Sequence, residues 1–347
     1  NTIQTAGSSP GFAPVAAQLF YEPSPAALAR YYDTFSPEAY GDQAAVTTYA
    51  SDRFADAMMS CPVAPGRPQG SDQGCVWARI STRSLTLDAT AQDQAFRERS
   101  RGLSFGVEAA PAEGWRVGAA ASAESVDTGL TPFTSGDGER YQFGVTVKRL
   151  AGPFTLALAA GTGVSDLETR RYVLLPGGQS QAQATQTLSF QALTARASWR
   201  LGSDSFYARP MVEVSRMTVD TDGFTETGAG ALNLVVPGQS SDTTRASFKV
   251  ELGGEFSQGG NVARPYARVG VSSLVSGAES PFTAGFQAAP GGVNPFDVTS
   301  RLDKTTFDAE LGVTAVSDRG SARLGWSGQF GDRIANQTFA IKLTVAF

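Results

Sequence analysis

The chain has 347 residues, a formal net charge of −5 and no histidine. The lack of histidine excludes Ser-His-Asp and Cys-His nucleophiles, histidine general bases and metal sites that use histidine ligands. Only 18% of the residues are charged, the balance is slightly acidic, and no apolar run reaches the roughly 18 residues of a membrane-spanning helix, so neither a nucleic-acid partner nor such a helix is expected.

The N-terminal residues 1–35 are expected to form a linker. Glycine, serine and proline recur through residues 1–25, and these residue types are typical of turns and loops.

A helix is predicted directly after this linker, in the region 36–61. Ser36 is a good N-cap, Pro37 suits the first helical position, and Glu38 would meet the positive end of the helix dipole. From residue 37 to residue 60 the helix would be about 36 Å long, enough to cross a hydrocarbon core of about 30 Å. It is too polar to contact lipid. A helix inside a polar lumen and a surface helix packed by a sparse apolar stripe both fit this composition. After Glu38, its charged residues are Asp42, Asp52, Arg53 and Asp56.

Cys61 and Cys75 are the two cysteines of the chain, and a Pro/Gly-rich loop separates them. This loop offers neither thiol an apolar core, which favours one local disulfide and an oxidising compartment. Two free thiols in a reducing compartment are the alternative. Residues 62–75 are accordingly expected to form a disulfide loop.

Alternation with period 2 runs from about residue 76 to the C-terminus. In the last segment an apolar row from Phe339 to Phe347 alternates with small or polar residues. The same pattern predicts twelve strands, at 76–88, 98–110, 114–126, 139–150, 153–167, 185–201, 205–218, 243–257, 262–275, 300–316, 320–331 and 335–347.

The connections between these strands alternate between short and long. The longest are rich in Gly, Ser, Pro and Thr, and they are expected at 127–138, 168–184, 219–242 and 276–299. A soluble sandwich has no reason to sort its loops in this way, whereas an outer-membrane barrel has tight turns on one side and longer loops on the other. The fold class predicted is an all-β membrane protein, a twelve-stranded antiparallel up-and-down transmembrane β-barrel over residues 76–347.

The two faces of the strands support a barrel in lipid. One face is apolar and the other carries ionisable groups of both signs, so the charged face should line a hydrated lumen. These groups would either hold the helix or pair across neighbouring strands. The predicted luminal wall comprises Arg79, Arg83, Glu108, Arg140, Arg196, Arg209, Glu213, Glu251, Glu255, Arg264, Arg268, Glu310 and Arg323.

Four features together carry a resemblance to a known family. They are the helical run 28–59, the first strand that begins Val76-Trp77-Ala78-Arg79, the Ala-Arg-Pro element used at 208–210 and 263–265, and the terminal Phe347. In this order they resemble the translocator (β-domain) of classical autotransporters of the type V secretion system, over residues 28–347.

The resemblance implies a helix in the pore and export of an N-terminal passenger to the cell surface. It makes residues 1–35 a passenger remnant, places Cys61–Cys75 at the periplasmic corner, and makes Phe347 the assembly signal read by the barrel assembly machinery. The location implied is the outer membrane of a Gram-negative bacterium, with the N-terminal segment toward the cell surface and the C-terminus in the periplasm. The partners implied are outer-membrane lipid and lipopolysaccharide, periplasmic chaperones and the chain's own passenger, around a monomeric barrel.

The chain also departs from that family pattern. The stretch before the helix holds no parallel β-helix repeat, and the helix 37–60 has no asparagine of the kind with which some members cut their passenger. No catalytic residue, cofactor or metal is expected. Two alternatives are a passive pore with an N-terminal plug, and a scaffold whose loops 219–242 and 276–299 bind a partner or surface.

Overall fold

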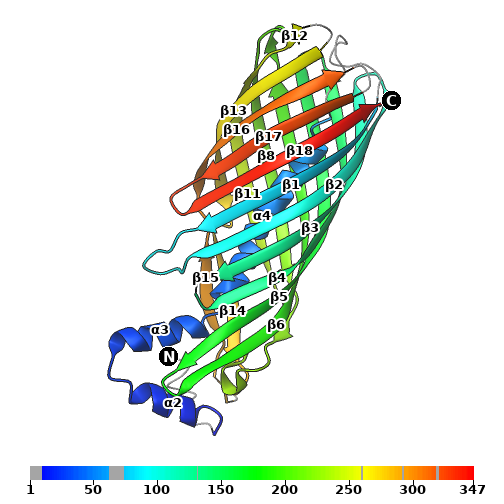
Figure 1. Ribbon diagram of the computed structural model, residues 1–347. Helices are drawn as coiled ribbons and strands as arrows, with labels where there is room; N and C mark the ends of the chain where they lie inside the picture. The colour runs from blue at the N-terminus through cyan, green and yellow to red at the C-terminus, as the bar shows by residue number, and fades with distance from the viewer. Residues whose placement is uncertain (1–9, 62–73, 131, 259–260, 291–292, 318–319) are drawn as a thin grey trace.

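Twelve long antiparallel strands form a closed barrel in the computed structural model, which describes residues 10–61, 74–130, 132–258, 261–290, 293–317 and 320–347 (Figure 1). Each strand pairs with the next one along this series, and two short strands, β7 (Leu201–Gly202) and β12 (Phe256–Gln258), extend the sheet. The twelve are β1 (Cys75–Leu87), β2 (Phe96–Ala112), β3 (Trp115–Leu130), β4 (Thr134–Ala151), β5 (Phe154–Leu175), β6 (Gly178–Trp199), β8 (Tyr207–Thr221), β11 (Gln239–Gly253), β13 (Asn261–Ser276), β16 (Thr305–Ser317), β17 (Gly320–Phe330) and β18 (Ile334–Ala346).

The seam of the barrel lies between its first and last strands. Cys75 is opposite Ala346 and Leu87 is opposite Ile334, with an unbroken register between them. Beyond the strands, the backbones of Gly74 and Phe347 exchange hydrogen bonds of 3.0 and 3.1 Å. Closure leaves no unpaired strand edge, which a sheet surrounded by lipid requires.

The two faces of the barrel follow the predicted alternation. On β4 the apolar side chains of Phe143 and Val145 lie exposed on the outside, whereas Arg140 and Gln142 are buried inside. Ile341 of β18 is likewise exposed on the outside. The prediction of an apolar outer face and a polar lumen is therefore confirmed. Among the described helices, none has the length and apolarity to cross a membrane.

Two of the predicted long loops are wrong. Strands β3 and β4 continue through most of 127–138, and β5 and β6 extend through 168–184 until only residues 176–177 separate them. These hairpins carry Gly, Ser, Thr and Gln, so the alternation that marks a lipid-facing strand is lost although the ladder hydrogen bonds continue.

The other two long connections contain a small sheet at one end of the barrel. Its four strands are ordered β15-β14-β10-β9, and a 3₁₀ helix, η1 (Gly230–Leu232), precedes β10. Their bounds are β9 (Phe224–Thr225), β10 (Leu234–Val236), β14 (Glu279–Phe286) and β15 (Phe296–Arg301). We call this the long-loop end, and the opposite end, with turns such as 113–114 and 152–153, the short-turn end.

Two helices lie in residues 1–35, which were expected to form a linker, and only residues 28–35 also belonged to the helical run on which the family resemblance rested. They are α2 (Ala13–Phe20) and α3 (Pro25–Phe35), both at the long-loop end (Figure 1). Each has a proline in its first turn, and the Ser24 hydroxyl accepts a hydrogen bond from the Ala27 N–H at 3.2 Å. The prolines therefore mark helix starts, where the missing N–H costs nothing.

The predicted central helix forms α4 (Glu38–Met58), which begins one residue after Pro37. Pro37, and not the predicted Ser36, takes the N-cap position, and Ser36 accepts a hydrogen bond from the Glu38 N–H at 3.2 Å. The helix runs inside the barrel from the long-loop end toward the short-turn end (Figure 1), and 17 of its 21 residues are buried. A helix so polar and buried on all sides fits a polar lumen and excludes the surface position.

Candidate functional site

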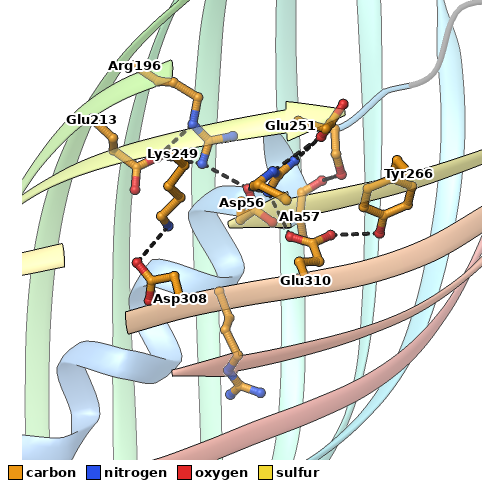
Figure 2. A network of polar contacts seen from close by, with 12 residues as sticks. Asp56, Ala57, Arg196, Glu213, Lys249, Glu251, Tyr266, Asp308 and Glu310 are labelled. Carbon is orange, nitrogen blue, oxygen red and sulfur yellow. Dashed lines mark hydrogen bonds and ion pairs between the residues drawn. The ribbon is translucent and has the colours of Figure 1, made fainter. Parts of the chain in front are cut away.

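The candidate site is the barrel lumen around α4, and its short-turn half is a network of charges. Asp56 of α4 accepts a hydrogen bond from Arg196 at 2.8 Å and lies 3.7 Å from the Arg268 guanidinium (Figure 2). Arg196 also bonds Glu213 on the neighbouring strand at 2.6 Å. One carboxylate of the helix thus meets cations from two strands of the wall, β6 and β13, which are separated by β8 and β11.

Arg268 is the centre of this network. It donates to Glu251 at 2.7 Å and to Glu310 at 2.7 Å, and Arg323 donates to Glu310 at 2.9 Å. Tyr266 also donates its hydroxyl hydrogen to Glu310, at 2.7 Å (Figure 2). Because each carboxylate has several donors, the charges stay satisfied although they are largely removed from bulk water.

Further ion pairs surround a cavity of about 270 Å³ next to the C-terminal end of α4. Arg209 pairs with Glu251, and Arg264 donates to Glu255 at 2.8 Å. A second cavity, of about 130 Å³, lies beside the helix between Asp56 and the wall. The lumen is therefore filled at its long-loop end and partly open at its short-turn end.

The C-terminal end of α4 is held by the last strand of the barrel. The Lys342 ammonium donates to the carbonyl oxygens of Ala57 at 3.0 Å and Ser60 at 2.7 Å. The same nitrogen lies 4.1 Å from the centre of the Trp77 ring on β1. A cation at the negative end of the helix dipole satisfies carbonyls that the helix itself leaves unpaired.

A second charged group occupies the middle of the lumen. Arg53 of α4 pairs with Glu124 at 3.3 Å, and Arg140 bridges Glu124 and Glu98 at 3.2 Å each. Arg83 also pairs with Glu98, and all four side chains of this wall group are buried. At this level, ion pairs between side chains connect the strands of the wall to one another, independently of the helix.

Asp52 lies near the same level on another side of α4. It pairs with Arg245, whose guanidinium lies 4.4 Å from the centre of the Tyr49 ring. Helix and wall are thus joined by Asp52, Arg53 and Asp56, on different sides of the helix.

The long-loop end is different, because apolar side chains close it. A cluster of buried residues joins α2, α3, the start of α4, the extended β5–β6 hairpin and the small sheet. We call this assembly the cap. Its buried members are Phe12, Val15, Leu19, Phe35, Tyr40, Val173, Ala182, Leu232, Leu234, Val236, Phe282, Ala284 and Phe286.

A buried ion pair lies within the cap. Glu226 pairs with Arg171 of β5, accepts a hydrogen bond from the Tyr40 hydroxyl at 2.9 Å, and accepts another from the Leu234 N–H at 2.8 Å. Arg171 also donates to the Thr34 carbonyl. This group ties the start of α4 to both the hairpin and the small sheet.

The structure brings all thirteen predicted wall residues to the lumen. Of the four charged helix residues that were predicted to meet the wall, Asp42 behaves differently. Among the described residues Asp42 has no ion pair with the wall, whereas Arg79 donates to the Arg53 carbonyl at 3.4 Å. Most wall pairs join neighbouring strands and a few reach the helix, so both interpretations left open by the sequence occur. The wall residues whose contacts lie in the lumen are Arg79, Arg83, Glu108, Arg140, Arg196, Arg209, Glu213, Glu251, Glu255, Arg264, Arg268, Glu310 and Arg323.

Several site residues were missed by the sequence reasoning. Glu98 and Arg245 stand at inward positions of predicted strands, so the alternation alone could have found them. Arg171 and Glu226 fell in predicted loops, where no pattern assigned them a face.

Cys61 and Cys75 are joined by a disulfide, as the sequence favoured. The bond links the chain just after α4 to the first residue of β1, so it anchors the end of the helix to the wall. Most of the predicted loop 62–75 lies outside the described residues.

Nothing in the described ranges provides a metal centre of three or more His, Cys, Asp or Glu side chains. The geometry defines a class: a closed twelve-stranded barrel of outer-membrane type whose lumen holds a helix from the segment that precedes the first strand.

Comparison with known proteins gives that class a family. Residues 76–329 match the model of the autotransporter β-domain, so the chain belongs to that family, whose barrels reside in the outer membrane of Gram-negative bacteria. It is a family of translocator barrels and not of enzymes.

Solved structures agree on the fold. The translocator domain of the autotransporter NalP from Neisseria meningitidis is 14% identical, with a TM-score of 0.72 over 90% of this chain and 100% of that one. The β-domain of the Bordetella autotransporter BrkA is 19% identical, with a TM-score of 0.56 over 79% and 99%. The transport unit of AIDA-I from Escherichia coli is 11% identical, with a TM-score of 0.54 over 88% and 99%. A search of curated proteins returned no match.

Proposed function

We propose that this chain exports an N-terminal passenger and anchors it at the cell surface. The observation that carries the proposal is the course of α4, which connects the long-loop end to the short-turn end through the lumen. The described residues before Glu38 lie at one end of the barrel, while the disulfide and the paired backbones of Gly74 and Phe347 lie at the other. Export of the segment that precedes α4 through the lumen would leave the chain in this arrangement, with α4 still inside the barrel.

The proposed orientation follows from the two kinds of connection. Short turns face the periplasm and longer connections face outward in outer-membrane barrels. The segment before α4 would therefore face the cell surface, and Phe347 would face the periplasm. Residues 1–35 then form the junction with the passenger.

The luminal residues have a holding role in this proposal. Asp52, Arg53 and Asp56 reach cations or anions of the wall, so the helix is retained in one position after export. Ser36 and Pro37 define the point where the chain enters the lumen. The remaining wall charges pair with one another and keep the lumen hydrated.

The proposed partners concern assembly. The Phe347 side chain is 63% exposed at the end of the last strand, where the barrel assembly machinery could bind it before the seam closes. Periplasmic chaperones would hold the unfolded chain, and lipid and lipopolysaccharide would surround the apolar outer face.

The test is a tag accessibility experiment in a Gram-negative host. An epitope placed before Asn1 should bind antibody on intact cells. The matched control carries the same epitope between Glu113 and Gly114, a short turn, and should bind antibody only after the outer membrane is permeabilised. An N-terminal epitope that needs permeabilisation would contradict the proposal.

A passive pore is the alternative, and the packing argues against it. The helix is buried over most of its length, and the two cavities of about 130 and 270 Å³ lie only in the short-turn half. A continuous water path would require α4 to leave the lumen.

A further inference from the structure

We propose that a groove on the outer face of the barrel binds one phospholipid, with an acyl chain in the groove and the phosphate on Arg149. The groove has a volume of about 510 Å³ and lies at the short-turn end, outside the lumen. It is independent of the passenger-export proposal, because the side chains proposed to bind the lipid lie on the outer face of the barrel and not in the lumen.

Two rows of lipid-facing side chains that run across neighbouring strands define the groove. In one row Leu156 lies opposite Ala197, which lies opposite Val212. In the other, Leu158 lies opposite Ala195, which in turn lies opposite Val214. The larger side chains stand about half exposed on both sides of the two alanines. The alanines form the floor of a depression that only an apolar occupant would fill favourably in a bilayer.

A cation closes one end of the depression. Arg149 follows Val145 and Val147 in the outward-facing row of β4, two residues before the strand ends. Its guanidinium lies 5.3 Å from the centre of the Trp115 ring and donates one hydrogen bond to the Glu113 carbonyl at 2.7 Å. It forms no ion pair with another residue in the described part of the chain.

The chemistry of this end selects the occupant. An arginine on the outer face this close to the end of its strand lies at headgroup depth, where tryptophan is also preferred. The anion available there is a lipid phosphate, which a guanidinium binds with two parallel hydrogen bonds. A phospholipid supplies both the phosphate for Arg149 and the acyl chain for the adjacent groove.

The test is native mass spectrometry of the full chain reconstituted in bilayers of phosphatidylglycerol and phosphatidylethanolamine and then released into mild detergent. The unsubstituted chain should retain one phospholipid. Arg149→Gln should lower the retained fraction by roughly fivefold through loss of the charged hydrogen bonds, and the double variant Ala195→Leu, Ala197→Leu should lower it similarly by filling the groove.

Matched controls keep the outcome interpretable. Arg97→Gln removes an exposed outer arginine at the long-loop end of β2, away from the groove, and Ala123→Leu with Ala315→Leu fills lipid-facing positions on β3 and β16. Folding of every variant is checked by the mobility shift of the unheated barrel on a denaturing gel. Equal lipid retention by folded groove variants and controls would overturn the proposal.

Discussion

The two ends of the lumen hold the same helix by different physical means. At the long-loop end, the cap buries aromatic and aliphatic side chains around Tyr40 and Phe35, with one ion pair inside it. At the short-turn end, charges beside two cavities bind α4 to the wall: Asp56 of the helix pairs with Arg196, and Lys342 of the wall donates to helix carbonyls. Apolar burial does not depend on salt, whereas partly hydrated ion pairs weaken as ionic strength rises.

The difference teaches where the lumen is sealed and where it is only occupied. The cap excludes water by packing, so its loss would expose the start of α4 without emptying the barrel. The charge network at the short-turn end surrounds space that water can enter, so the helix itself blocks the lumen there.

The largest expected effect comes from removing the helix. In planar bilayers a chain that starts at Cys61 should conduct at least about tenfold more than the full chain, because a barrel of this size without its filling encloses water. Removing residues 1–35 alone should leave conductance low, since α4 remains. Equal conductance of all three chains would show that α4 does not block the lumen.

A smaller effect is expected within the cap from Glu226→Gln. The change leaves Arg171 buried without its counter-charge, which should cost roughly 3 kcal/mol of local stability. The amides of β9 and β10 should then exchange hydrogen about a hundredfold faster. The control, Arg216→Ala, breaks an exposed pair and should change exchange by little, since such pairs contribute at most about 1 kcal/mol. Unchanged exchange in Glu226→Gln would contradict the assigned role of the pair.

The smallest effect is expected from Asp56→Asn in the charge network at the short-turn end. Asp56 is 39% exposed, so solvent screens its pairs with Arg196 and Arg268 and the loss should be about 1 kcal/mol. Brief openings of the full-length chain in bilayer recordings should become about fivefold more frequent. Asp204→Asn, in an exposed turn, is the control. A variant that stays as closed as the unsubstituted chain would show that Asp56 does not help to hold the helix.

The barrel could be predicted wherever lipid imposes a pattern. The last strand was expected at 335–347 and lies at Ile334–Ala346, because apolar residues must face outward at every second position. Where β5 and β6 extend beyond the lipid, both faces meet water or the cap, and the pattern disappears. The cap was missed for the same reason, since its apolar residues are scattered over segments that read as linker and loops.

The sequence predicts which charged residues face the lumen, but it does not predict which residue each of them pairs with. Inward positions identified Arg196, Arg268 and Glu251 as wall residues. That Asp56 would meet both Arg196 and Arg268 depends on the stagger of the strands around the closed barrel and on the rotation of α4. Neither quantity can be read from one alternating segment.

The contacts of Lys342 have a consequence for the order of folding. Its partner Ala57 on α4 lies 285 positions earlier in the chain, and the ring beside its ammonium belongs to the first strand. Contacts between segments so distant in sequence form late, since the entropy lost in closing the intervening loop must be offset first. The carbonyl groups at the C-terminal end of α4 therefore gain the Lys342 ammonium only after the final strand has been synthesised and has paired with the first strand. A helix bonded to Lys342 thus marks a barrel whose assembly is complete.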